Sequence, residues 1–537
     1  MGARRDRLAG LCVICLLAGA GLTRAATPDL RLVNAAAEQD KVAIRALLKQ
    51  GVDVNAARAD GVTALLWAAH FNDLESVTLL LGAGARVNVA DDHGMTPLAQ
   101  ACENTNLAMV EKLLAAGARP DAALTSGLTP LMIAAHTGDL AIVKSLLAHG
   151  ANVNAATTST GETALAWAVS DRHLDVARAL IENQANVRAS SKKGFTPLMY
   201  AARNGAIDMA TLLVAAGADV NEVVDGTHVL PFAIASGQDE FARFLIEKGA
   251  DPNGSIDGVR ALHAAAGAVE LWLENWTRRH GGGNVYSAGG AGARGLSPER
   301  RAALVKTLLE RGADPNARIT TSAMLMSYVG YPTKGAFEGF ACGTGDLRGA
   351  TPLWVAALAA NGGVPFGDGA PSPGSGSSAV IRSLIAAGAD VRLTTDDGTT
   401  PLMVAAGLGR STFSPGLQRG RRSPDAEDAV TILLDAGAQI NAVNEADFTA
   451  LHGAAFRGVD DVIKLLVDRG AHINARDFRG RTPYRLAEGS KQSFQFQAYP
   501  GTAAFLKTLG ADTRLGIPGT VQERSRDLAA AASNQKP

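Results

Sequence analysis

The sequence predicts an all-α fold, a stacked solenoid of helix-turn-helix units with projecting turn or finger loops. The first observation is a fixed restart: units begin at Gly61, Gly94 and Gly127, which are 33 residues apart (94 − 61 and 127 − 94), and such a period indicates a solenoid. The second is a hydrophobic content of 47% with only 5% aromatic residues, so the core consists mainly of Ala, Leu and Val. Later units begin at Gly161, Gly194, Gly226, Gly258, Gly349, Gly398, Asp447 and Gly480.

Residues 1–25 have the pattern of a secretory signal peptide. A basic start is followed by the apolar run 8–22 and by small residues at Thr23 and Ala25, which predicts cleavage after Ala25. The apolar run is shorter than the ~20 residues that a membrane span needs. We therefore expect a periplasmic or secreted protein with no stable membrane insertion after signal cleavage. The periplasm is favoured because the signal implies crossing one membrane only.

Each unit carries the signals that begin and end two helices. In the unit that starts at Gly194, Thr196 is placed to cap a helix and Pro197 takes the first helical position. Gly217 is placed to end the second helix in a left-handed conformation. Asp219 and Asn221 are then expected to make turn bonds to their own backbone.

The pattern G-x-T-P-L-x-x-A-A followed by V-x-x-L-L-x-x-G-A-x-x-N closely resembles the ankyrin repeat, over about residues 28–514. The resemblance implies an ankyrin-repeat solenoid that binds other proteins. Thr-Pro becomes Thr-Ala in three units, and residues 227–235 lack the pair at its usual place. We expect weaker helix caps in those units.

The repeat pattern also predicts how the chain is organised. After the signal peptide come an N-terminal capping repeat (26–60) and regular repeats (61–257). Repeats with long insertions occupy residues 258–446, followed by the last repeat and C-terminal cap (447–514) and a disordered tail (515–537). The insertions span residues 269–300, 319–348, 361–378 and 410–427.

The first insertion begins with an aromatic stripe. Val269, Trp272, Leu273 and Trp276 follow the spacing i, i+3, i+4, i+7, which predicts that the first helix of this unit continues for two or more turns. The stripe either packs on the neighbouring insertion as a small satellite core or forms a partner-docking patch. Trp272 and Trp276 are therefore candidate partner-binding residues. We expect that replacing residues 268–300 by a short turn leaves folding nearly intact.

Two sets of columns differ from unit to unit, and the ankyrin resemblance implies that they line the concave binding surface. The residues after the Ala-Ala pair are His70, Phe71, Glu103, Asn104, His136, Thr137, Ser170, Asp171, Arg203, Asn204, Phe456 and Arg457. The finger-tip residues are Asp92, His93, Lys192, Lys193 and Phe195. In contrast, the column at or near the residue before Ala-Ala is expected to pack between repeats as core. Its aromatic members are Trp67, Trp167, Tyr200 and Phe232.

The sequence shows no catalytic constellation. It contains no H-E-x-x-H, no phosphate-binding loop and no G-x-S-x-G elbow. His263 and His452 occupy a position at which ankyrin repeats place a histidine that bonds locally, so both are expected to be structural. The formal net charge of −1 argues against nucleic-acid binding. We therefore expect no enzyme activity, cofactor or metal.

These observations favour a non-catalytic protein–protein interaction scaffold of the cell envelope. It would bind another protein through the concave surface and the inserted loops, and it is expected to be monomeric. Two alternatives remain open: an accessory subunit of an exported enzyme or redox complex, and a secreted effector that targets host proteins. The sequence leaves the identity of the partner open.

Overall fold

The computed structural model describes residues 29–267, 269–280, 296–321, 347–360, 377–408, 424–478, 480–492 and 495–516. The predicted signal peptide and nearly all of the predicted tail lie outside these residues, as do residues 281–295 of the first insertion and most of each of the other three. The chain forms two compact units, Met1–Thr125 and Ser126–Pro537. Each unit is described by itself.

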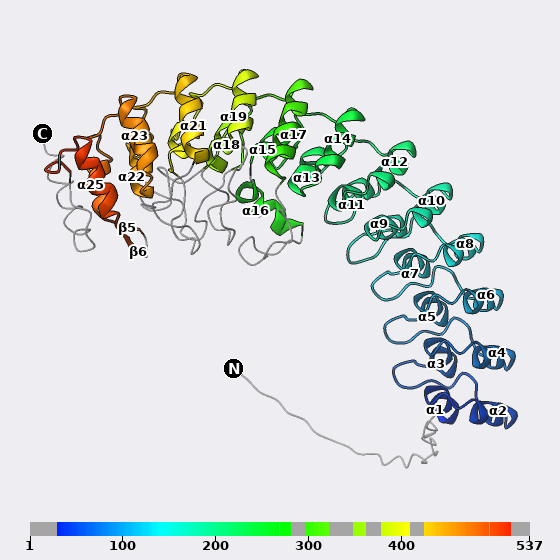
Figure 1. Cartoon of the computed structure of the whole chain (residues 1–537). Coiled ribbons are helices and arrows are strands. Elements are labelled where there is room, and N and C mark those ends of the chain that lie inside the picture. Colours follow the sequence, from blue (N-terminus) through cyan, green and yellow to red (C-terminus); the bar gives the residue numbers. More distant parts are fainter. Residues whose placement is uncertain are drawn as a thin grey trace, which may run out of the picture. The chain divides into compact units, whose positions relative to one another are not determined.

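The first unit contains three helix pairs. The first helices of these pairs, α1, α3 and α5, pack side by side, and each also packs on its own second helix (Figure 1). The helices are α1 (Arg31–Ala37), α2 (Lys41–Lys49), α3 (Ala64–His70), α4 (Leu74–Gly82), α5 (Pro97–Glu103) and α6 (Leu107–Ala115).

The second unit continues the same arrangement with two rows of helices. The first-helix row is α7 (Pro130–Thr137), α9 (Ala164–Ser170), α11 (Pro197–Asn204), α13 (Val229–Ala235), α15 (Ala261–Ala266), α18 (Pro352–Ala360), α20 (Pro401–Ala405), α22 (Ala450–Arg457) and α24 (Pro483–Glu488). The second-helix row is α8 (Leu140–Ala148), α10 (Leu174–Glu182), α12 (Ile207–Ala215), α14 (Asp239–Glu247), α17 (Pro298–Glu310), α19 (Ser377–Ala386), α21 (Pro424–Asp435), α23 (Asp460–Asp468) and α25 (Pro500–Thr508). The helix α16 (Glu270–Arg279) belongs to neither row.

The first-helix row and the finger loops form the inner side of this unit, which we call the concave face (Figure 1). Single backbone hydrogen bonds join adjacent fingers, as from Lys192 N to Thr160 O at 2.7 Å. Two fingers pair more fully into an antiparallel sheet of four two-residue strands: β1 (Val223–Val224), β2 (Thr227–His228), β3 (Ser255–Ile256) and β4 (Val259–Arg260). A separate hairpin joins β5 (Ser490–Gln492) and β6 (Gln495–Gln497). The predicted helical solenoid is therefore confirmed, with short strands confined to loops.

Threonine caps begin the first helices as expected. The Thr196 hydroxyl accepts a hydrogen bond from Met199 N, and Pro197 takes the first helical position. The expected weakening of the Thr-Ala units is wrong, since the threonines that precede α3, α9 and α22 still cap their helices. The hydroxyl makes the cap, and proline adds only a fixed backbone angle. The expectation holds for α13, because the residue that precedes it, His228, makes no side-chain cap.

A row of asparagines links the loops that follow the second helices. Asn221 donates through Nδ2 to Gly249 O at 3.0 Å and accepts from Asp251 N at 2.7 Å. The expectation that its side chain bonds to its own turn is therefore wrong, because only Asp219 does so, accepting from Asn221 N at 2.9 Å. Asn88, Asn154, Asn253, Asn316 and Asn441 make the same pair of bonds to their next loops.

The two histidines expected to be structural are confirmed as such. His263 is fully buried, accepts from Arg260 N at 3.2 Å through Nδ1, and donates from Nε2 to Ala317 O at 3.0 Å. Burial lowers its pKa to about 4, so the ring is neutral at physiological pH. His452 bonds in the same way to the backbone N of Thr449 and to the carbonyl of the next finger.

The first helix of the inserted unit does not continue as expected. The helix α15 ends at Ala266, and α16 begins as a separate helix at Glu270. Between them Gly267 lies against Val355 of α18, and a Cβ at this glycine would lie 2.7 Å from the Val355 side chain and 3.0 Å from its carbonyl oxygen. The break therefore occurs where the backbone approaches the next first helix too closely for any other residue.

Candidate functional site

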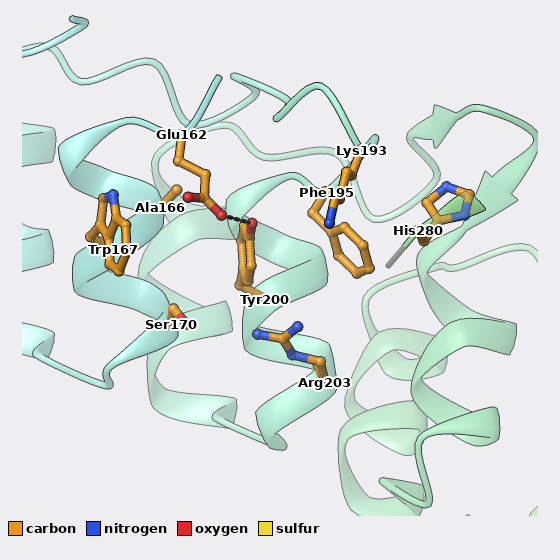
Figure 2. Close-up of a pocket in the computed structure, with 9 residues that line it drawn as sticks. All are labelled: Glu162, Ala166, Trp167, Ser170, Lys193, Phe195, Tyr200, Arg203 and His280. Carbon is orange, nitrogen blue, oxygen red and sulfur yellow. Dashed lines mark hydrogen bonds between the residues drawn. The ribbon is translucent and has the colours of Figure 1, made fainter. Parts of the chain in front are cut away.

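A cavity of about 240 Å³ lies on the concave face of the second unit. Figure 2 shows that its wall combines α9, the finger loop before α11, α11 itself and the end of α16. Four of the candidate site residues come together here: Ser170, Lys193, Phe195 and Arg203. The remaining lining residues are Glu162, Ala166, Trp167, Tyr200 and His280.

A carboxylate and a phenol form one fixed side of the cavity. The Tyr200 hydroxyl donates to Glu162 Oε1 at 2.8 Å, and the Thr160 hydroxyl donates to Glu162 Oε2 at 2.8 Å (Figure 2). Burial, together with the hydrogen bond to Glu162, raises the pKa of Tyr200. The phenol therefore stays protonated and both carboxylate oxygens are occupied.

Two cationic side chains border the same cavity, and both are exposed. The guanidinium of Arg203 lies 5.2 Å from the ring centre of Tyr200 and 5.7 Å from that of Phe195. Cation–π contacts of this kind keep the guanidinium beside the two rings. In the part of the chain that the structure describes, no carboxylate forms an ion pair with Lys193 or Arg203.

A cluster of aromatic rings packs around Phe195 at one side of the cavity. Phe195 is 8% exposed, and its ring contacts those of Tyr200, Phe232, Trp276 and His280 at centroid distances of 5.5–6.3 Å. The prediction that Phe195 is a finger-tip contact for a partner is therefore only partly right. Its side chain lines the cavity, but most of its ring is buried in the core.

The interpretation of Trp272 and Trp276 as an exposed docking patch is wrong. Trp276 is 8% exposed and donates to the Thr227 hydroxyl at 2.7 Å. Trp272 is 1% exposed, donates to Leu347 O at 3.2 Å and packs edge-on against Trp354 at 6.2 Å. The stripe joins the main core of the array, with one bond to the end of the neighbouring insertion. An amphipathic pattern shows that one face is buried but not what covers it.

The aromatic column expected to be core divides into two pairs. Tyr200 and Phe232 are buried, whereas Trp67 and Trp167 are half-exposed on the first helices. The indole Nε1 atoms of both tryptophans are shielded from solvent, yet neither has a hydrogen-bond partner among the described residues. The core interpretation is therefore wrong for Trp67 and Trp167. A shielded N–H without an acceptor is uncommon because it costs desolvation energy.

Beside the cavity, His136 and Asp171 form a pair that the sequence could not join. Their Nδ1 and Oδ2 atoms lie 2.7 Å apart, and the imidazole lies edge-on to Trp167 at 5.0 Å. In the first unit, His70 and Phe71 gather around Trp67 in a similar way, with Phe71 stacked on the indole at 5.5 Å.

Two candidate asparagines serve mainly to join repeats. Asn204 donates from Nδ2 to Ser170 O at 2.8 Å, and Asn104 donates to Ala69 O at 2.8 Å. Their amide N–H groups therefore hydrogen-bond to the preceding repeat, and we correct their assignment as partner-binding residues.

The other candidates lie outside the cavity. Lys192 donates from Nζ to Thr158 O at 2.6 Å, and Thr137 donates to Ala134 O at 3.1 Å. Phe456 and Arg457 lie half-buried at the end of α22, where burial lowers the pKa of Arg457. Of the six candidates in the first unit, His70, Phe71 and Asn104 are described above. Asp92 and His93 are exposed, and Glu103 accepts from Gln100 Nε2 at 3.0 Å.

Sequence reasoning missed Glu162, Tyr200, Trp167 and His280 as parts of the site. The histidine carried a signal, because it lies eleven residues after Val269 (280 − 269) and so continues the helical stripe of α16. Its Nδ1 donates to Trp276 O at 2.7 Å, and its ring stacks on that of Trp276 at 4.3 Å.

Among the residues that the structure describes, no group of three or more His, Cys, Asp or Glu side chains is arranged to hold a metal ion. No helix in this part of the chain is both long and apolar enough to cross a bilayer.

Comparisons with known proteins agree on the repeat. The match to Ankyrin repeat and KH domain-containing protein mask-1 of Caenorhabditis elegans is 44% identical over 59 residues, covering 11% of this chain but only 2% of that protein. The human ASB11 ankyrin repeat domain is 29% identical, with a TM-score of 0.36, covering 40% of this chain and 96% of the other. A family model for ankyrin repeats (3 copies) matches residues 32–123, 120–191, 184–256 and 372–477. Since these matches cover more than half of the chain, the protein belongs to the ankyrin repeat family, whose repeats bind other proteins and are generally non-enzymatic.

Proposed function

We propose that this protein is a non-catalytic scaffold of the cell envelope that holds a protein partner on its concave face. The cavity between α9, α11 and α16 is the centre of the binding site. The observation that carries the proposal is that Ser170 and Arg203, which occupy variable positions in two consecutive repeats, both line this cavity. Lys193 of the finger loop and His280 of the inserted segment complete the wall.

The side chains at the cavity have the character of an interface centre. Trp, Tyr and Arg are the residue types that most often carry binding energy between proteins, and Trp167, Tyr200 and Arg203 all line this cavity. The half-exposed ring of Trp167 can contact a partner, whereas its Nε1 atom is shielded from solvent.

The inserted helix α16 contributes by shaping the site. Its two tryptophans are buried, while His280 at its end closes one side of the cavity. Binding would therefore combine the concave columns with the insertion, and the residues around α16 would distinguish this protein's partner from those of other ankyrin arrays.

The envelope location rests on the basic start and apolar run of residues 1–25. Cell fractionation followed by N-terminal sequencing tests it. We expect a processed chain that begins at Ala26 and lies outside the cytoplasm. A cytoplasmic chain that retains residues 1–25 would contradict export and leave the binding site unaffected.

Site-specific photo-crosslinking in the producing cell tests the binding site. A photoreactive amino acid replaces Lys193 at the cavity or, as a matched control, the exposed Lys144 of α8. We expect a discrete protein adduct from position 193 only. Adducts that form equally from both positions, or only from position 144, would contradict binding at the concave face.

A further inference from the structure

We infer that the cavity binds a carboxylate side chain, an aspartate or glutamate, presented by the protein partner. This inference rests on the proposed function of the same site and specifies the chemistry of its ligand. Its basis is that Lys193 and Arg203, two exposed cations with no described ion-pair partner, border one cavity whose wall also contains the aromatic rings of Trp167 and Tyr200.

The two cations of the wall form no ion pair within the described part of the protein. Lys193 and Arg203 are exposed, and Figure 2 shows both side chains extending toward the middle of the cavity. Arg203 is held on the faces of Tyr200 and Phe195. A guanidinium held beside these rings can make a two-point contact with a carboxylate.

The one acidic residue of the wall offsets only one of the two cations, so the formal charges of Lys193, Arg203 and Glu162 leave an excess of one positive charge (2 − 1). Glu162 accepts one hydrogen bond on each oxygen, from Tyr200 and from Thr160. Burial and this carboxylate together keep the phenol protonated by raising the pKa of Tyr200. The exposed polar groups of the wall are therefore donors, the ammonium of Lys193 and the guanidinium of Arg203.

A carboxylate on a short apolar stem suits this wall. A carboxylate is an acceptor-only group with two oxygens, and the aromatic faces of Trp167 and Tyr200 offer contacts for the methylene groups of a glutamate. A phosphate would bring a charge of about −1.5 to −2 into a cavity that already contains the Glu162 carboxylate. The wall is therefore better matched to a single negative charge.

Three short peptides test the inference on the full chain without its signal segment. They are acetyl-Leu-Glu-Leu-amide, its Gln counterpart and its phosphoserine counterpart. The readout is the NMR signal of the Trp167 indole N–H, identified by its loss in Trp167→Phe. We expect the Glu peptide to shift this signal in a saturable way below about 10 mM, and the Gln peptide to bind about tenfold or more weakly.

Charge-neutralising variants provide the matched control. The double variant Lys193→Gln, Arg203→Gln should lose the response to the Glu peptide. The control double variant Lys144→Gln, Arg178→Gln removes two exposed cations from α8 and α10 and should keep that response. Circular dichroism spectra and thermal midpoints of both variants establish that loss of binding is not loss of folding.

The inference is overturned if the Gln peptide binds as well as the Glu peptide, if no peptide shifts the signal, or if the cavity variant still responds. Tighter binding of the phosphoserine peptide would replace the carboxylate with a phosphate as the ligand. These results are separable from failure of the proposed function. If the peptide test fails but a partner still crosslinks from position 193, the carboxylate inference is wrong and the proposed scaffold function stands.

Discussion

The indole N–H of Trp276 donates a hydrogen bond to the hydroxyl of Thr227 at 2.7 Å, although the two residues are 49 positions apart. This bond ties α16, an inserted element, to a finger of the regular array. The Trp276 ring also packs on that of Phe232 at 5.6 Å. These contacts oppose the expectation that residues 268–300 can be replaced by a short turn without loss of folding.

Truncation of Trp276 should loosen α16 and the neighbouring finger. Trp276→Ala removes a buried ring, which typically costs about 3–5 kcal/mol, and leaves Thr227 and Phe232 uncovered. Because a repeat array unfolds locally, hydrogen exchange is the suitable measurement, with faster exchange expected in residues 227–236 and 269–280. Trp276→Phe keeps most of the ring and should lose only about 1 kcal/mol with the hydrogen bond. Unchanged exchange in both segments would show that α16 is peripheral.

Removing one asparagine from the row that links the loops after the second helices should weaken the interface between two repeats. Asn221→Ala loses the bonds to Gly249 O and Asp251 N, at a cost of about 1–2 kcal/mol. The urea midpoint of the full chain should fall accordingly. Asn221→Asp keeps the acceptor and loses the donor, so it should be intermediate. Equal urea midpoints for Asn221→Ala and the parent protein would show that this row of asparagines does not contribute to stability.

Asp397 should make the array less stable as the pH rises from about 4 to 6. Burial, followed by the charge of Glu445, raises the pKa of Asp397 from 3.8 to about 6. The native state then binds a proton that the unfolded state has lost, so the stabilisation present at low pH disappears as the pH passes 6. Between pH 4 and 7, the stability of Asp397→Asn relative to the parent should rise by at most about 3 kcal/mol. Denaturant titrations at both pH values measure this change, and a constant difference would refute it.

His263 should act in the opposite direction over a similar range. Burial lowers the pKa of His263 from 6.5 to about 4, so the unfolded state binds the proton first. The stabilisation present above pH 6.5 is therefore lost as the pH falls toward 4, by about 3 kcal/mol. His263→Gln should be less stable than the parent at pH 7 but should lack this acid sensitivity. If the acid sensitivity persists in His263→Gln, another group carries it.

Part of the candidate site could be found in the sequence and part could not. Comparing units within the chain nominates Ser170, Lys193 and Arg203, because such a comparison separates constant positions from variable ones. It could not find His280, which lies 118 residues after Glu162 (280 − 162) and reaches the same cavity only because α16 packs across the concave face. Nor could the comparison distinguish Trp167 from Tyr200. The two residues occupy the same position of the repeat, but only Tyr200 is buried in the structure.

The repeat, its helix caps and its structural histidines could all be predicted from the sequence alone. These features depend on contacts within a few residues, as between Thr196 and Met199 N, or on a position that recurs in every unit, as for His263 and His452. By contrast, the partners of Asn221, the break at Gly267 and the burial of Trp272 and Trp276 depend on contacts between distant segments. Periodicity fixes which face of a helix is apolar, whereas the surface that covers this face depends on chain segments far apart in sequence.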